Sequence, residues 1–204
     1  MAFNPFFSGQ GGANFEYSVC ALYLVYLITE DIPYPLSSKM TKIDLQTSYK
    51  QDTIEDFVIL CKDNEQESEN YFQMKHSLDF NKKDDQFQKF LRNAWNQFDR
   101  KSFNIEKDKI VLGLGILPNE IQKDFIPLYE WAKYSSDANN FIMKITTPNY
   151  SSQNKRSYFT LIKSSLNEIT KTEIPEDKIW KFFKSLIYHL AYVFKPPLTD
   201  SFSY

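Results

Sequence analysis

A small group of polar residues at the ends of two apolar segments could do chemistry in this sequence. Asp56 stands at the start of the apolar run 57–60, and Gln73 and Lys75 lie two residues apart in the β-rich run 71–76. Because side chains alternate along a strand, Gln73 and Lys75 share one face, and an antiparallel neighbour brings Asp56 close if the register allows. Charged groups rarely project from such apolar strands unless they are paired or bind metal.

This arrangement predicts a site for a hard divalent cation such as Mg²⁺, or Mn²⁺ in its place. Asp56 supplies a carboxylate, Gln73 a side-chain carbonyl, and Met74 a backbone carbonyl. Lys75 then stands beside the metal, where it orients an attacking water and stabilises charge on a phosphate. Glu16, in the first turn of the first predicted helix, completes the metal shell or holds the water.

The order of these residues resembles the PD-(D/E)XK endonuclease superfamily, in the variant where Gln replaces the second acid. The pattern is a Glu in the first helix, an Asp at a strand start and Gln73-Met74-Lys75-His76-Ser77 on the next strand, preceded by Gln10-Gly11-Gly12. More narrowly, it is similar to the N-terminal double-stranded DNA nuclease domain of bacterial anti-phage effectors of the CBASS, STAND and Lamassu types. Mrr-like restriction enzymes are broader relatives. The likeness covers about residues 10–95.

The resemblance implies a metal-dependent endodeoxyribonuclease that hydrolyses phosphodiester bonds of double-stranded DNA as the effector of an anti-phage defence system. By the same resemblance, Asp56 is the metal-binding Asp, Gln73 the variant second position, Lys75 the catalytic Lys and Glu16 the helix-borne acid. The implied partners are DNA and a fused or separate sensor or ATPase component, and the active form is an oligomer. Accessory roles beside the site are assigned to Glu55, His76 and Ser77.

Several alternatives remain open at this stage. Asp52 and Glu55 also lie near the strand start, and Asp56 is preferred because an apolar strand follows it directly. Glu16 could simply stabilise the helix dipole, since acids are favoured in a first turn. The whole set could be a surface ion-pair cluster on an ordinary α/β domain. The domain could also be a catalytically inactive relative that binds nucleic acid or a partner protein.

Charge is polarised along the chain although the total is nearly neutral. The 204 residues carry 24 Lys and Arg against 26 Asp and Glu, a net charge of −2, which excludes a uniformly basic nucleic-acid binder. Residues 52–73 carry a net −6, whereas residues 74–109 and 144–204 carry +3 and +4. Solvated helix faces explain the later bases as well as DNA does. Predicted phosphate contacts come from the first basic block: Lys82, Lys83, Lys89 and Arg92.

The elements that must position these residues indicate an α/β fold in one domain. Asn14 is the predicted N-cap of a buried helix over 15–29 that follows the break at Gly11-Gly12. Strands are predicted over 42–50, 54–61, 71–76, 109–117 and 141–147, a charged hairpin loop over 63–70, and further helices over 84–101, 118–134, 158–170 and 175–194. The expected architecture is a restriction-endonuclease-like α-β-β-β-α-β core sheet flanked by helices, with a C-terminal helical extension. The nuclease-like domain covers 1–195, and 196–204 reads as a linker or disordered tail.

Other chemistries have weaker support. Cys20 and Cys61 fit buried free thiols, and His189 fits a structural histidine on an apolar helix, so no usual zinc site is expected. Gly113-Leu114-Gly115 lacks the further glycine and lysine of phosphate loops. No signal peptide is expected, and the longest apolar run, 19–28, is about half of a membrane span. The sequence therefore predicts a cytoplasmic protein without a membrane segment.

Overall fold

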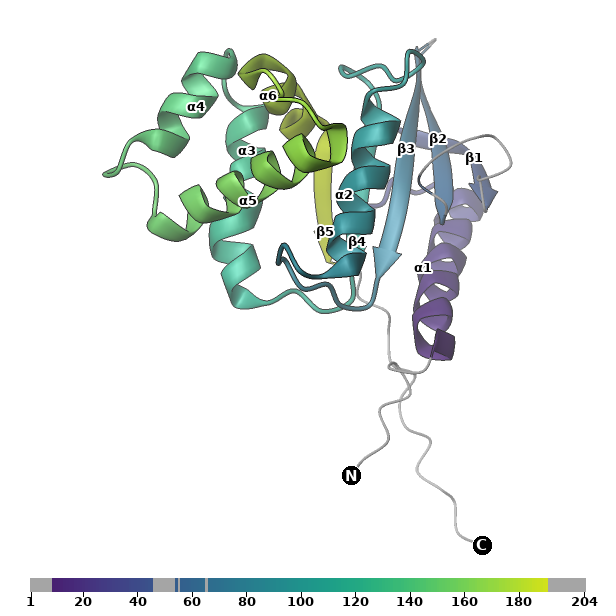
Figure 1. Ribbon diagram of the computed structural model, residues 1–204. Coiled ribbons are helices and arrows are strands. Elements are labelled where there is room, and N and C mark those ends of the chain that lie inside the picture. The colour runs from purple at the N-terminus through teal and green to yellow at the C-terminus, as the bar shows by residue number, and fades with distance from the viewer. Residues whose placement is uncertain (1–8, 46–53, 55, 65, 191–204) are drawn as a thin grey trace, which may run out of the picture.

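The computed structural model describes residues 9–45, 54, 56–64 and 66–190, which build a five-stranded mixed sheet of order β1-β2-β3-β4-β5 with helices on both faces (Figure 1). The first three strands form an antiparallel meander: β1 (Lys39–Leu45), β2 (Phe57–Asp63) and β3 (Gln66–Lys75). Two further strands, β4 (Lys109–Leu114) and β5 (Leu186–Leu190), add in parallel to β3. The predicted α/β class is confirmed.

Helices cover the two faces of the sheet unequally (Figure 1). One face is covered by α1 (Gly9–Thr29), and α2 (Asp85–Phe98) packs on the opposite face as the crossover between β3 and β4. The remaining helices follow β4 and precede β5 in the sequence, and they pack on the α2 side of the sheet. They are η2 (Ile121–Phe125), α3 (Ile126–Lys133), α4 (Ala138–Thr146), α5 (Gln153–Thr170) and α6 (Glu176–Ser185).

The sheet separates two apolar cores because alternate side chains of each strand point to opposite faces. On β3, Phe72 and Met74 pack under α1, whereas Tyr71 joins the core on the α2 side. The α2-side core is much the larger, and it includes Phe182 and Phe183 of α6. The helices predicted as a C-terminal extension share this main core and lead into β5, so they belong to the body of the domain. The predicted tail 196–204 lies outside the described residues.

The prediction for the second helix is confirmed, and its local causes are visible. Asp84 caps the helix by accepting a hydrogen bond from the backbone N–H of Phe87 at 2.6 Å. The apolar residues then recur at helical spacing and are all buried: Phe87, Phe90, Leu91, Ala94, Trp95 and Phe98. Propensity, cap and periodicity agree at this position, which is why sequence reasoning found the element.

The start and the burial of the first helix differ from the prediction. The helix begins at Gly9 and runs through Gly11-Gly12, so Asn14 is an internal residue and no N-cap. Each helical glycine costs about 1 kcal/mol relative to alanine, and the packing of Phe15, which is buried against the sheet, offsets that cost. The helix is also not buried all round, because one stripe of apolar side chains faces solvent.

Strand boundaries shift in the meander. Part of the predicted first strand, 46–50, lies outside the described residues, and the observed strand starts earlier, at Lys39. The predicted charged loop 63–70 is mostly strand, because β3 begins at Gln66 and pairs with β2 out to Asp63. Asn64, with φ of 55°, takes the left-handed conformation that allows so tight a turn. Asp63, Glu67 and Glu69 therefore lie on exposed strand positions.

Two C-terminal elements were predicted with the wrong type. The run 141–147 is helix α4, because the Asp137 carboxylate accepts from the Asn140 N–H at 2.8 Å and Phe141 and Ile145 are buried one turn apart. Residues 186–190 of the predicted helix 175–194 are strand β5, paired with β4, and residues 191–194 lie outside the described residues. Short apolar runs fit a buried strand or a buried helix equally well by periodicity, so tertiary pairing decides between them.

Two further predictions are tested by the described residues. Cys20 and Cys61 are free and buried, as expected. No helix in the described ranges has both the length and the apolarity that a membrane span requires.

Candidate active site

Several elements meet at the edge of the sheet where β3, β4 and β5 end. These three strands are parallel, so their carboxyl ends lie together, and the loop that leads into α2 leaves from the same edge (Figure 1). The N-terminal half of α1 lies against this edge, since Phe15 contacts His76 at the end of β3. Crevices outside the carboxyl ends of parallel strands are frequent ligand sites in open α/β sheets.

Asp56 is placed at this edge by the antiparallel pairing of β2 with β3. Phe57 is opposite Phe72, so the residue before β2 continues the ladder opposite Gln73. The Asp56 Oδ2 atom accepts a hydrogen bond from the backbone N–H of Met74 at 2.5 Å. The carboxylate therefore lies between the two residues that the sequence singled out on β3, and the predicted proximity is realised.

Gln73 is almost fully buried, with an exposed fraction of 3%. It is flanked in the sheet by Leu112 of β4. Its Oε1 atom is buried and has no hydrogen-bond partner among the described residues. An acceptor in this state costs about 1–3 kcal/mol of stability unless a ligand satisfies it. Gln73 is thus the most unusual polar group of the site.

Lys75 and Glu16 come together from different elements. The Nζ atom of Lys75, near the end of β3, lies 3.4 Å from Oε1 of Glu16 on α1. The two side chains are 20% and 32% exposed, so the ion pair sits at the rim of the edge rather than in the core. The two residues are 59 positions apart, and their predicted proximity is confirmed, whereas their role in a site stays a prediction.

Two of the residues that fix this contact, Phe15 and Gly115, were not found from the sequence. Phe15 packs edge-to-face on the His76 ring, with centroids 5.8 Å apart and planes at 87°. A Cβ atom on Gly115 would lie 2.9 Å from the Phe15 ring and 3.0 Å from the His76 carbonyl oxygen. Gly115 therefore allows the Phe15 ring to pack at the strand ends. This packing brings the adjacent residue, Glu16, close to Lys75. The available signal was a glycine at the end of an apolar strand, which often marks a close approach.

The predicted accessory residues have different outcomes. His76 contacts Phe15, and its backbone carbonyl accepts from the Ile116 N–H at 2.8 Å, which ties β3 to the segment after β4. Ser77 is exposed directly after it. Glu55, together with its alternative Asp52, lies outside the described residues.

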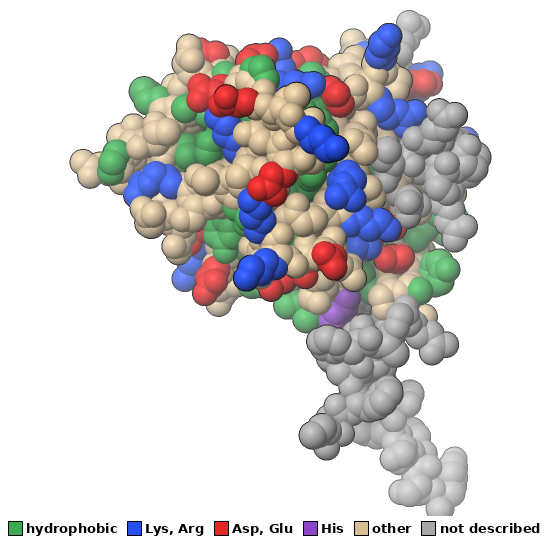
Figure 2. Space-filling model, in the orientation of Figure 1, with side chains coloured by type: hydrophobic (Ala, Val, Ile, Leu, Met, Phe, Trp, Pro, Cys, Tyr) green, Lys and Arg blue, Asp and Glu red, His purple; other side chains and the backbone are tan. Residues whose placement is uncertain are grey.

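The predicted DNA-contacting bases lie on the α2 side of the molecule. Lys82 and Lys83 are exposed in the turn before α2, and Lys89 and Arg92 are exposed one turn apart on α2 itself. Figure 2 shows Lys and Arg side chains over the part of the surface that α2 occupies in Figure 1. Lys82 forms an ion pair with Glu168 of α5, so its charge is partly engaged within the protein.

His189 differs from its prediction in the element that carries it. It lies on strand β5, not on a helix, and its ring is 5.4 Å from the Tyr34 ring. Burial lowers the pKa of His189 below the usual value of 6.5. The interpretation as a structural histidine stays a prediction.

The donor set at the edge is suited to a hard cation. Asp56 offers a carboxylate, Gln73 a buried amide oxygen, and Glu16 a second carboxylate at the rim. In the described part of the chain, no three His, Cys, Asp or Glu side chains gather into a metal-binding group. Gln73 lies outside that set of residue types, and it contributes the oxygen that lacks a partner.

Comparisons with family models, with characterised proteins and with solved structures give no significant match for this chain.

Proposed function

We propose that this chain is a metal-dependent endonuclease that hydrolyses phosphodiester bonds of double-stranded DNA. Asp56, Gln73 and Glu16 hold the cation, and Lys75 assists at the reacting phosphate. The resemblance in sequence further suggests an effector role in anti-phage defence, with a sensor or ATPase component as partner.

The buried Oε1 atom of Gln73 is the observation that carries this proposal. It lies on β3, one residue before Met74, whose N–H donates to the Asp56 carboxylate. In an ordinary structural site this acceptor would be paired or replaced by an apolar side chain, because leaving it unpaired lowers stability. A bound cation would give the oxygen a partner.

The order of elements supports the finer assignment to a restriction-endonuclease-like fold. α1 precedes an antiparallel β1-β2-β3 meander, and α2 crosses over to β4, which is parallel to β3. This is the α-β-β-β-α-β order that the resemblance implies, with the polar residues at the ends of β2 and β3.

Each side chain has a definite task in the proposed reaction. A bound Mg²⁺ or Mn²⁺ would activate water and polarise the scissile phosphate. The Lys75 ammonium group, held 3.4 Å from Glu16 at the rim, can donate hydrogen bonds to the phosphate oxygens as negative charge develops. The bond from the Met74 N–H orients the Asp56 carboxylate and restricts its rotation.

The direct test is digestion of linear plasmid DNA with Mg²⁺, with EDTA as the chelated control. Lys75→Ala is expected to reduce the cutting rate by about 100-fold or more, since it removes transition-state charge stabilisation. Lys107→Ala is the matched control, because Lys107 is exposed just before β4, at the opposite edge of the sheet from the end of β3, and its loss should leave cutting unchanged. Cutting that survives Lys75→Ala would rule out the proposed site.

A second variant separates function from stability at the same site. Gln73→Met keeps the shape of the side chain and removes the unpaired oxygen, so the melting temperature should stay the same or rise. Cutting should be lost because a cation ligand is gone. A variant that unfolds at lower temperature yet cuts normally would show that Gln73 is purely structural.

The alternative is a catalytically inactive nuclease-like module that binds nucleic acid or a partner protein. The exposed bases on and before α2 favour this reading, since they could hold phosphates without any cutting. Fluorescence anisotropy with duplex DNA decides between the two. Binding that depends on Lys89 and Arg92, without metal-dependent cutting, would establish the alternative.

A further inference from the structure

The outward side of α1 carries an apolar stripe that none of the described elements covers. Tyr17, Leu24, Val25 and Ile28 are 63%, 39%, 53% and 81% exposed, and Ala21 is exposed between them. The opposite side of the same helix packs on the sheet through residues such as Phe15 and Val19. A helix that is apolar on both sides is normally covered on both.

The stripe has the spacing of a helix-to-helix seam. Tyr17, Ala21, Leu24 and Ile28 are separated by four, three and four residues, which keeps them in one line along the helix. Ala21 lies near the middle, and its small side chain lets a second backbone approach closely. The pattern extends over three turns, long enough for two helices to interlock along their length.

No charged residue interrupts this face. From Tyr17 to Thr29 the chain contains no Asp, Glu, Lys or Arg, and the first charged positions are Glu30 and Asp31 beyond the end of the helix. A partner with charged groups here would bury them without counter-charges, which is costly. A surface of the same charge-free composition avoids this cost.

The size of the stripe fits a small specific interface. An aromatic side chain such as Tyr17 carries roughly 150–250 Å² and the aliphatic ones somewhat less, so the exposed parts of the stripe add up to on the order of 500 Å² per copy. Two copies would then bury on the order of 1,000 Å², which is about the lower limit for a specific protein interface. Figure 2 shows hydrophobic side chains at the right-hand edge, where α1 lies in Figure 1.

We propose that this stripe is a homodimer interface, in which α1 of one copy packs against α1 of a second copy. The pairing is isologous, so each stripe faces its own equivalent and every apolar position meets another. This inference does not depend on the proposed nuclease activity, because it uses only the outer side of α1.

The test is sedimentation equilibrium of the full chain over a range of concentrations, with the mass compared with 24.1 kDa for one copy. The wild-type chain should sediment with twice the mass of one chain. Ile28→Glu and, independently, Val25→Lys should raise the dissociation constant by about 100-fold or more, because each buries an unpaired charge in the dimer. Both positions are exposed within one copy, so the circular dichroism spectrum should not change.

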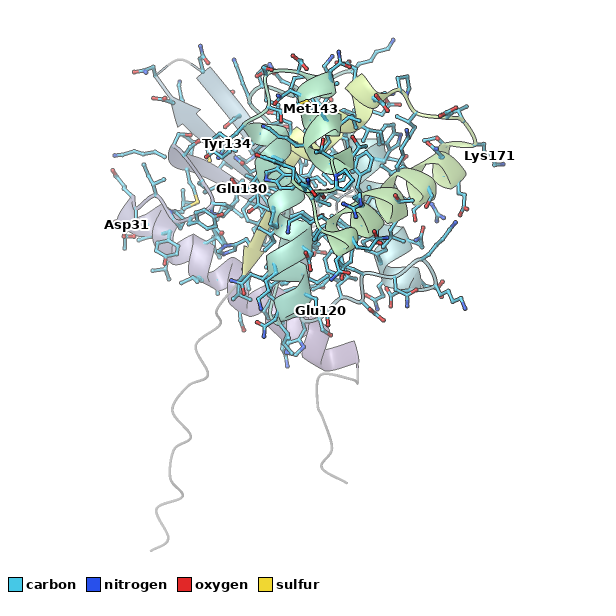
Figure 3. All side chains as sticks on the ribbon, turned by 90° about the vertical axis from the view of Figure 1, so that its left-hand side faces the viewer. Asp31, Glu120, Glu130, Tyr134, Met143 and Lys171 are labelled. Atoms are coloured by element: carbon cyan, nitrogen blue, oxygen red, sulfur yellow. The ribbon has the colours of Figure 1, made fainter. Side chains whose placement is uncertain are left out.

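Met143→Glu is the matched control, since Met143 is 57% exposed on α4, away from α1 (Figure 3). It should leave the dimer intact. A wild-type chain that stays monomeric at high concentration overturns the proposal, as does a dimer that survives both Ile28→Glu and Val25→Lys. A monomer that instead binds neutral lipid vesicles through Ile28 would also overturn it and assign the stripe to a lipid surface.

Discussion

The two faces of the sheet differ in how many layers protect them. On the α2 side, the helices from α2 to α6 enclose a large core. Aromatic rings contact one another within it, and the rings of Trp95 and Phe98, for example, both pack against the ring of Phe182. On the α1 side, one helix covers a smaller core built around Tyr23, Phe57 and Phe72. The α2 side therefore anchors the sheet, and within one copy α1 is held by one side only.

This difference matters for the candidate site because the site draws on both faces. Gln73 and Lys75 belong to β3, which is held between neighbouring strands, whereas Glu16 belongs to α1. Small displacements of α1 would change the distance from Glu16 to Lys75 and leave the strand residues in place. The thinner layer thus controls the rim of the site.

The largest expected contrast is between two buried phenylalanines. Phe87→Ala on α2 should lower the free energy of unfolding by about 3–5 kcal/mol, because its surroundings are packed on every side and collapse poorly. Phe15→Ala should lower it by only about 2–3 kcal/mol, since α1 can shift inwards from its solvent side. Urea denaturation of both variants gives the comparison. Equal losses would mean that α1 is held as firmly as α2.

The next effect concerns two glycines on the α1 side. Gly115→Ala should lower the free energy of unfolding by about 1–3 kcal/mol, because the added Cβ meets the Phe15 ring at 2.9 Å and the His76 carbonyl oxygen at 3.0 Å. Gly12→Ala is the control, since a Cβ at that helical position meets nothing within 4 Å.

The control should raise stability by about 0.5–1 kcal/mol through its better helix propensity. Thermal unfolding of both variants checks the signs. If Gly115→Ala is neutral, the close approach of Phe15 to the strand ends does not constrain α1.

A smaller difference between the two layers is expected in the reactivity of the two thiols that lie between α1 and the sheet. Cys20 and Cys61 both lie in the core on this side, and burial raises the pKa of each, to about 11 for Cys61. Both should react slowly with a thiol reagent at pH 8, because the thiolate is scarce and covered.

Labelling rates measured at increasing urea should give an opening free energy at least about 1 kcal/mol below that of global unfolding. The physical reason is that lifting α1 exposes both thiols while the α2-side core stays intact. Thiols that become reactive only with global unfolding would show that the two layers open together.

The smallest expected effect is on the pH dependence of stability, and it concerns His189. This residue lies on the same side of β5 as Ile187. Burial lowers the pKa of His189 in the folded protein, so the unfolded chain binds the proton more readily. The contribution of neutral His189 to the free energy of unfolding is therefore fully present above the unfolded pKa of about 6.5. It is lost as the pH falls below that value.

Melting curves from pH 7.5 to pH 5 should show that His189→Asn weakens the loss of stability on acidification, by about 2 °C or less. Comparing the variant with the wild type cancels the effect of the carboxylates, which titrate in both proteins. An identical pH dependence in the two proteins would show that the environment of His189 does not favour its neutral form.

Sequence reasoning succeeded where one local rule was enough. The capped helix from Asp85 and the apolar strand from Lys109 were found because propensity, periodicity and turn residues agree there. It also predicted that Asp56 lies against β3 and that Glu16 lies near Lys75, since strand alternation and the order of elements restrict where these residues can lie. Their assignment to one site stays a prediction. It failed at α4 and β5, where short apolar runs have no local feature that separates helix from strand.

Strand alternation, read from the sequence, puts Gln73 and Lys75 on one face of a strand, and the composition of α1 makes it apolar on all sides. Tertiary packing sets one side of α1 against the sheet and leaves the stripe around Ile28 outside it. It also decided that Gly115 makes room for Phe15, and that the Gln73 oxygen is buried without a partner. Burial and close approach depend on which segments meet across the sheet, and those contacts join residues far apart in the chain.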